Sequence, residues 1–156
     1  VMSTRQPRRI LLNDKSIETR IVASVAAPDP RSRETNAAFN TGTKVYSVNS
    51  FLSANALWSR NSLDDLDHCS TNNSTVCAVR EISVPQIYAA MGAASFVRDN
   101  ELMFEEARTS DKEYIVIEGA THGFTPCTAC EKTPGQYSNT MRNLFDHLGD
   151  WIKVHI

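Results

Sequence analysis

The chain has 156 residues, of which 41% are hydrophobic and 22% are charged, a composition typical of a globular domain. This length suits one domain or a large part of a bigger one. Sixteen lysines and arginines nearly balance eighteen aspartates and glutamates, which gives a formal charge of −2. Because binding to a nucleic-acid backbone needs a basic surface, this balance argues against a nucleic-acid partner.

Neither a membrane span nor a signal peptide is expected in this sequence. No apolar run approaches the roughly 20 residues needed to cross a bilayer. Residues 1–9 are polar and basic, without the apolar core of a signal peptide. We therefore expect no membrane contact, and, because Val1 precedes Met2, we expect a processed or truncated product.

Four cysteines form two local pairs, Cys69 with Cys77 and Cys127 with Cys130. An even number at short spacings predicts two small disulfide loops. Two overlapping N-x-S/T sequons within residues 72–75 lie inside the first loop, which is typical of an exposed surface loop. Together these features favour an oxidising compartment, so we expect a secreted or periplasmic protein.

Two alternatives for the cysteines stay open. With His68 and His122 they could supply four zinc ligands, although a C-x7-C spacing is loose for a zinc knuckle. The C-x2-C pair could also be a redox motif, but that motif should begin a helix after a strand, and here it lies between two prolines. We expect neither a metal nor a cofactor.

The first half of the chain is irregular in pattern. Residues 1–30 form an opening segment with one expected strand, at the apolar stretch 21–27, which ends at Pro28. Residues 31–81 are rich in Ser, Asn, Thr and Asp, and their one helical pattern lies within 51–58. We interpret 31–81 as a cap-like insertion.

Regular patterns return in residues 82–156. The apolar run 82–90 predicts a buried strand, 99–108 a helix with an acidic start, and 114–117 a second buried strand. Apolar residues at spacings of three and four predict a helix over 136–154. This alternation predicts an α/β fold, with parallel strands and flanking helices.

His122 is the main candidate for chemistry. It lies between Gly119 and Gly123 in the loop that directly follows the strand at 114–117. Ligands and reactive groups in α/β sheets gather outside the carboxyl ends of the strands, so this placement exposes an imidazole at the functional edge. The alternative is a loop histidine that serves structure only. His68, His147 and His155 have no comparable setting.

Three segments carry a family resemblance: V-P-Q-I-Y-A-A-M-G, then D-K-E-Y-I-V-I-E-G-A-T-H-G-F, then L-F-D-H-L-G-D-W-I. Over residues 82–153 the chain resembles the C-terminal part of an α/β-hydrolase. The resemblance implies an α/β-hydrolase sheet in which an acid follows one strand and a histidine follows the next. Residues 1–81 correspond to no motif of that family.

The resemblance implies roles for individual residues. His122 would be the general base and then the general acid of acyl transfer, and Asp99 would orient it. The position where the family often places its acid is Ser95, so Asp99 is the nearest carboxylate in the same loop, with Glu101 as the alternative. Asp99 also suits a helix N-cap, and the two roles are compatible.

The chain contains no G-x-S-x-G nucleophile elbow and no glycine-rich oxyanion loop. We therefore expect an N-terminal hydrolase piece of the same gene product to supply both, and we expect this chain alone to be inactive. The expected function is serine hydrolysis of a small ester-like substrate, with esterase, lipase, amidase and lactonase all open. The alternative is a non-catalytic interaction domain on a hydrolase-like fold.

Overall fold

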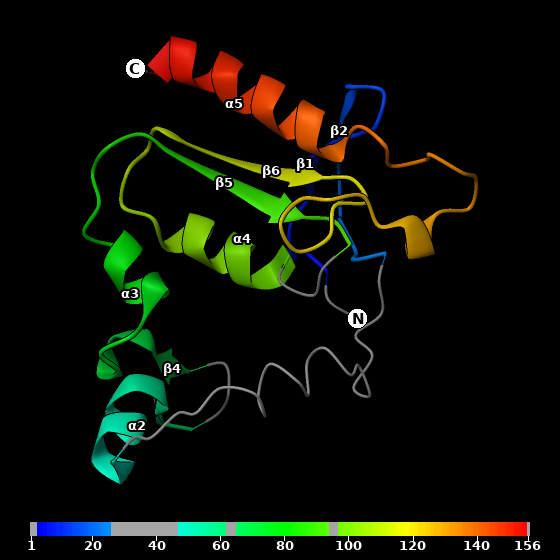
Figure 1. Ribbon diagram of the computed structural model, residues 1–156. Helices are drawn as coiled ribbons and strands as arrows, with labels where there is room; N and C mark the ends of the chain where they lie inside the picture. The colour runs from blue at the N-terminus through cyan, green and yellow to red at the C-terminus, as the bar shows by residue number, and fades with distance from the viewer. Residues whose placement is uncertain (1–2, 26–46, 62–64, 94–96, 156) are drawn as a thin grey trace. The chain divides into compact units, whose positions relative to one another are not determined.

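A computed structural model describes residues 3–25, 47–61, 65–93 and 97–155 (Figure 1). The chain divides into two compact units. The first consists of Val1–Pro28, Ser83–Glu105 and Thr109–Ile156, and the second of Asp29–Ile82 and Glu106–Arg108. Each unit is described by itself.

The first unit is built on a four-stranded sheet with the order β2-β1-β6-β5. Its strands are β1 (Arg8–Leu11), β2 (Ile17–Arg20), β5 (Gln86–Met91) and β6 (Lys112–Ile117). Strands β1, β6 and β5 are parallel, whereas β2 is antiparallel to β1. The carboxyl ends of three parallel strands therefore meet at one edge, as an α/β fold requires.

Helices cover the two faces of this sheet. Figure 1 shows α4 (Val97–Glu106) on one side and α5 (Thr140–His155) on the other. One apolar cluster joins Val97 and Phe104 of α4 to alternate residues of the strands, and a second joins Leu144 and Leu148 of α5 to the residues between them. The expected α/β class, with mostly parallel strands and flanking helices, is confirmed.

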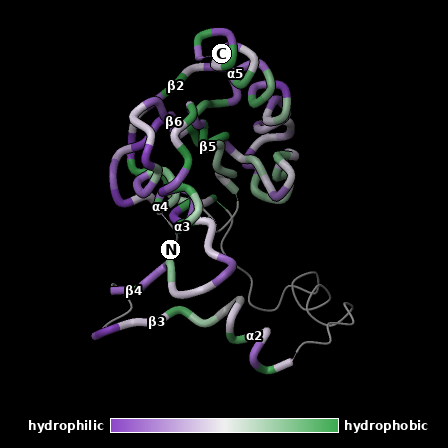
Figure 2. The backbone as a smooth tube through the Cα atoms, turned by 90° about the vertical axis from the view of Figure 1, so that its left-hand side faces the viewer, coloured by the Kyte–Doolittle hydropathy of each residue, from purple (hydrophilic) through white to green (hydrophobic). Residues whose placement is uncertain are grey.

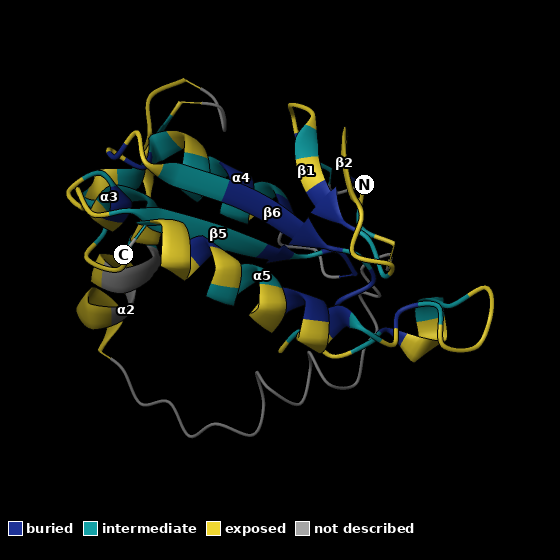
Figure 3. Ribbon diagram, turned by 90° about the horizontal axis from the view of Figure 1, so that it is seen from above, coloured by how far each residue is buried: buried dark blue, intermediate teal, exposed yellow. Residues whose placement is uncertain are grey.

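Strand β6 lies at the centre of the core. Its last four residues, Tyr114–Ile117, are all buried, and this part of the strand is dark blue in Figure 3. A strand covered on both faces needs a continuous apolar run, which is the pattern this sequence has. Figure 2 accordingly shows hydrophobic chain at β5 and in the second half of β6.

The strand predicted at residues 21–27 is wrong in its described part. Residues 21–25 contain one isolated bridge, between Ala23 and Ser3, and residues 26–27 lie outside the described residues. The strands of this region come earlier, as the β1–β2 hairpin. Its turn places Lys15 at φ 71°, and the Ser16 carbonyl accepts the Leu12 amide at 2.9 Å.

This hairpin was missed because β1 begins with two arginines, which are unusual in a buried strand. Both are compensated by distant carboxylates: Arg8 pairs with Glu101 at 2.7 Å, and Arg9 pairs with Glu113 at 2.5 Å. Only the last two residues of β1, Ile10 and Leu11, are buried.

Helix α5 begins four residues later than predicted, at Thr140, and ends at His155. Leu144 and Trp151 are buried against the sheet. Four further apolar side chains of the same helix are exposed: Met141, Phe145, Ile152 and Val154. The apolar surface of α5 is therefore wider than the face that the sheet covers.

The second unit contains short elements. They are α2 (Val48–Asn55), β3 (Trp58–Ser59), β4 (Leu66–Asp67), the 3-10 turn η1 (His68–Ser70) and α3 (Thr75–Val79). Strands β3 and β4 pair antiparallel. The expected helical pattern near residues 51–58 thus corresponds to a helix that ends at Asn55.

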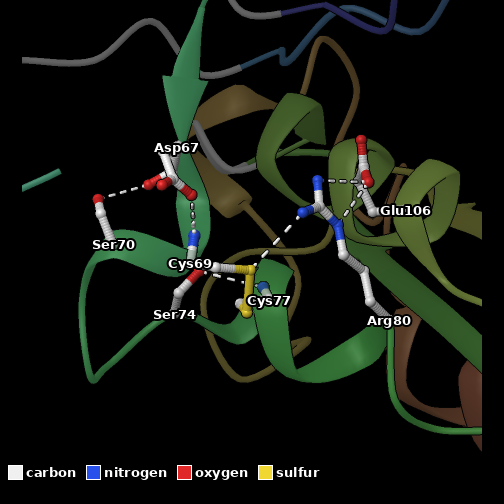
Figure 4. The surroundings of a disulfide bond; sticks show 7 residues. All are labelled: Asp67, Cys69, Ser70, Ser74, Cys77, Arg80 and Glu106. Carbon is white, nitrogen blue, oxygen red and sulfur yellow. Dashed lines mark hydrogen bonds and ion pairs between the residues drawn. A yellow bond between two sulfur atoms is a disulfide. The ribbon is translucent and has the colours of Figure 1, made fainter. Parts of the chain in front are cut away.

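A disulfide between Cys69 and Cys77 links η1 to α3, with 5.1 Å between the Cα atoms (Figure 4). Arg80 donates to Glu106 at 2.8 Å and to the Cys69 sulfur at 3.6 Å. The second disulfide, Cys127 with Cys130, belongs to the first unit. Both predicted pairings are confirmed.

Candidate functional site

The loops that follow β5 and β6 are fixed to each other at the carboxyl edge of the sheet. The Gly92 amide donates to the Ile117 carbonyl at 2.9 Å, and the Ala93 amide donates to the Ala120 carbonyl at 2.8 Å. Backbone N–H and C=O groups away from water need hydrogen-bond partners, and here the two loops supply them to each other. The two loops that the sequence singled out are therefore neighbours.

Two positions in these loops require glycine. At Gly92 an added Cβ would lie 2.6 Å from the Ile117 carbonyl oxygen, which leaves no room for a side chain. Gly119 has φ +64°, and an added Cβ would lie 2.1 Å from the ring of Tyr137. Each strand is thus followed within two residues by a glycine, because the chain must turn where other atoms are already packed.

His122 lies in a tight loop that closes on itself. The Thr121 amide donates to the Thr125 carbonyl at 2.8 Å, and the Phe124 amide donates back to the Thr121 carbonyl at 2.9 Å. Gly123 and Phe124 both have positive φ, 82° and 62°. A non-glycine residue in this region is strained, and such strain concentrates where a loop must hold a special shape.

The loop holds its own backbone and leaves the imidazole to solvent. The carbonyl of Phe124 accepts the Thr140 hydroxyl at 2.7 Å, which ties the loop to the first residue of α5. The His122 side chain is exposed, and within the described residues no hydrogen bond or ion pair engages it. The loop thus presents a ring that is available as a base or as a donor.

The disulfide Cys127–Cys130 lies beside this loop. Cys127 is buried and packs with Ala93 and Tyr137, and the Cys127 amide donates to the Gly119 carbonyl at 2.9 Å. The bridge therefore contacts the chain that leaves β5 as well as the chain that leaves β6. A bridge in this position stiffens the chain next to the histidine loop.

Asp99 lies in the first turn of α4 and is exposed. In the described part of the chain no hydrogen bond or ion pair joins Asp99 to His122. Both residues follow the carboxyl ends of neighbouring strands, β5 and β6, so they share an edge of the sheet without touching. Ser95, where the family often places its acid, lies outside the described residues.

Glu101, the alternative acid, is engaged elsewhere. Its side chain is completely buried, and its oxygens accept the Arg5 amide at 2.7 Å and the Gln6 amide at 3.2 Å. Arg8 and Arg98 each donate to it at 2.7 Å. Burial alone would raise the pKa of Glu101, but these four hydrogen bonds outweigh it and lower that pKa.

Sequence reasoning missed the polar contacts that hold the residues just after β1 to Glu118 and to α5. The carboxylate of Glu118 accepts the Asn13 amide at 3.0 Å, and the buried Asn143 side chain donates to the carbonyls of Leu12 at 3.0 Å and Asn13 at 3.1 Å. Asn143 precedes Leu144 on the buried face of α5, so helical spacing alone could have marked it. These contacts fasten the end of β1 beside the candidate site.

The other histidines of the first unit lie at the opposite, amino-terminal ends of the strands. His147 contacts the Glu113 carboxylate at 3.0 Å. His155 contacts Asp111 at 2.7 Å and stacks on the Trp151 ring, with 4.4 Å between centroids. Both rings are held by partners, in contrast to His122.

A cavity of about 360 Å³ lies at that same amino-terminal end. Three of its lining side chains are basic: Arg8, Arg9 and Lys112. The two arginines are paired with carboxylates, and Lys112 donates to the Phe104 carbonyl at 2.7 Å. Because His122 is not part of the lining, this cavity is separate from the candidate site.

Comparisons with family models, with curated proteins and with solved structures found no match to this chain. In the described part of the chain, no helix is both long enough and apolar enough to cross a lipid bilayer. The four cysteines are all bonded in pairs, which is typical of proteins from oxidising compartments.

Proposed function

We propose that this chain is the C-terminal portion of a secreted or periplasmic serine hydrolase of the α/β-hydrolase type, which cleaves carboxylic esters by acyl transfer. The observation that carries the proposal is the free imidazole of His122. It is presented by a closed loop directly after the central buried strand, where the carboxyl ends of three parallel strands meet.

In the proposed reaction His122 removes the proton from a serine hydroxyl as that oxygen attacks the ester carbonyl. The protonated ring then gives the proton to the departing alkoxide, and the cycle repeats with water to release the acid. Asp99 orients the ring and stabilises the imidazolium. Its lack of a present contact with His122 is compatible with this role, since catalytic hydrogen bonds often tighten only when substrate binds.

The serine and the oxyanion hole come from a second polypeptide segment, since this sequence contains no nucleophile elbow. Two surfaces of the first unit suit such a partner. In the described part of the chain β5 is the last strand on its side of the sheet, and it is largely apolar. An exposed apolar strand edge is a ready template for another strand.

The exposed apolar side chains of α5 are the second such surface. Phe145 is 63% exposed, and Met141 and Ile152 are also exposed along the same side of the helix. Large apolar groups that follow one side of a helix favour burial against another element. We place the nucleophile-bearing segment against β5 and α5 for these reasons.

The first experiment is intact mass measurement and N-terminal sequencing of every polypeptide in the native material, followed by labelling with a fluorophosphonate probe. We expect a second polypeptide that co-purifies with the chain and takes the label on a serine. A single unlabelled species of 17.3 kDa would contradict the enzyme proposal and favour a non-catalytic interaction domain.

The role of His122 is then tested in the assembled protein with a short-chain p-nitrophenyl ester. We expect His122→Ala to reduce kcat/KM by several orders of magnitude, because the nucleophile loses its base. His68→Ala is the matched control, since His68 belongs to the second unit, and it should leave the rate unchanged. Equal effects of the two changes would contradict the assignment.

The orienting acid is tested by Asp99→Asn. We expect a fall in kcat of about 10⁴-fold, since an amide cannot stabilise the imidazolium by charge. Asp111→Asn is the control, because Asp111 pairs with His155 at the opposite end of the strands. An unchanged kcat in Asp99→Asn would remove Asp99 from the mechanism while leaving the role of His122 intact.

A further inference from the structure

The loop closed by the Cys69–Cys77 disulfide holds two overlapping glycosylation sequons. Asn72-Asn73-Ser74 offers Asn72 as the acceptor, and Asn73-Ser74-Thr75 offers Asn73. The disulfide fixes both ends of this loop, between η1 and α3. The sequence alone does not choose between the two asparagines, but their contacts do.

Asn72 is tied into the second unit by both its side chain and its backbone. Its side-chain Nδ2 donates to the Ser53 hydroxyl at 2.5 Å, and its amide donates to the Ser53 carbonyl at 3.0 Å. The Thr71 hydroxyl donates to the same carbonyl at 2.9 Å. The Asn72 amide nitrogen is therefore part of the contact that attaches the loop to α2.

Asn73 lies in the turn directly before α3, and its side chain is exposed. Within the described residues its side-chain amide makes no hydrogen bond. The next residue, Ser74, caps α3 by accepting the Cys77 amide at 3.1 Å, as Figure 4 shows. A large group on Asn73 therefore displaces neither the helix cap nor the contact with Ser53.

We propose that Asn73 carries an N-linked glycan and that Asn72 does not. In the transfer, Asn73 Nδ2 bonds to C1 of the first sugar of a lipid-pyrophosphate-linked oligosaccharide. The bond between C1 and the phosphate oxygen breaks, the lipid pyrophosphate leaves, and Nδ2 loses one proton to a base of the transferase. This inference is independent of the hydrolase proposal and uses the second unit alone.

The disulfide supports this assignment from chemistry. Disulfides form in the same oxidising secretory compartments in which asparagine glycosylation takes place, so one environment accounts for both features. On Asn72 a sugar would replace a proton on the nitrogen that lies 2.5 Å from the Ser53 hydroxyl. A sugar on Asn73 leaves every described contact of the loop in place, whereas a sugar on Asn72 would crowd the Ser53 hydroxyl.

The test is site mapping on the full chain, expressed behind a secretion leader in a eukaryotic cell. The purified protein is reduced and digested with trypsin, and the peptide spanning residues 61–80 is treated with peptide N-glycosidase in H₂¹⁸O. The enzyme converts a glycosylated asparagine to an ¹⁸O-labelled aspartate. We expect the label at Asn73, and fragmentation of the peptide separates this position from Asn72.

Matched variants remove one sequon at a time. Asn72→Gln keeps the sequon of Asn73 and should keep the glycan. Asn73→Gln and Thr75→Ala leave only the sequon of Asn72, and both should lose the glycan. Thr75→Ser keeps a hydroxyl in the sequon of Asn73 and should keep the glycan. Label at Asn72, label at both positions, or an unlabelled peptide from the secreted wild type would each overturn the proposal.

Discussion

The two ends of the parallel strands in the first unit are built with different chemistry. At the amino-terminal end, side chains carry charge and are paired: Arg9 with Glu113, and His155 with Asp111. At the carboxyl end the loops are held by backbone hydrogen bonds, and His122 is left without a partner among the described residues. Charged pairs fix side chains at one end, whereas an exposed imidazole without a partner lies at the other.

The largest expected effect comes from breaking the buried charge cluster. Glu101→Gln keeps the shape of the side chain but removes the buried carboxylate that Arg8 and Arg98 share, which should cost about 4 kcal/mol of unfolding free energy. Urea unfolding measures it in a Trp58→Phe background, in which Trp151 fluorescence reports on the first unit alone.

Glu105→Gln is the control for this change. Glu105 contacts the same two arginines, but its side chain is 32% exposed, so the loss should be about 0.5 kcal/mol. Similar losses for Glu101→Gln and Glu105→Gln would show that burial adds nothing to the cluster.

The same carboxylate predicts a dependence of stability on pH. Hydrogen bonds lower the pKa of the folded Glu101 below its usual 4.5, so below that pH the unfolded chain binds this proton more readily than the folded one. The stabilisation is complete above the unfolded pKa and is lost as pH falls toward the folded pKa.

The difference in stability between wild type and Glu101→Gln should therefore shrink as pH falls from about 5 to about 3. Urea midpoints measured at steps across this range check the prediction. A difference that stays constant with pH would contradict the claim that the ionised carboxylate of Glu101 stabilises the folded state.

At the carboxyl end the largest stability effect should come from Gly119→Ala. The new Cβ clashes with the Tyr137 ring, and the alanine must adopt a positive φ. We therefore expect a loss of about 3 kcal/mol of unfolding free energy. Gly123→Ala has the same backbone strain with open space around it, and should cost about 1 kcal/mol. Equal losses would contradict the packing argument.

The elements around the candidate site could be predicted from sequence because their signals are local. The run at 114–117 marks β6, the spacing of three and four marks α5, and the glycines mark the ends of the strands. The disulfides also join cysteines that are close in sequence. The loop of His122 follows from these features alone.

The rest depends on residues that are distant in sequence. Strand β1 begins with two arginines. Their charges are compensated by Glu101 and Glu113, which lie more than ninety positions away in the sequence. Likewise nothing near Glu118 indicates that it holds the Asn13 amide. Such contacts have no periodicity, so a pattern of local hydrophobicity does not show them.

The smallest expected effect on stability is that of His122→Ala, at the carboxyl end of the strands. His122→Ala should change the unfolding free energy by less than about 0.5 kcal/mol, because an exposed ring without a partner contributes little to the folded state. His147→Ala, which removes a half-buried ring from Glu113, should cost about 1 kcal/mol in the same assay. A loss in His122→Ala that matches or exceeds the loss in His147→Ala would mean that the loop needs its histidine for folding. A near-zero loss would mean that the ring of His122 does not stabilise the strained loop. This is the result expected if His122 has the proposed catalytic role.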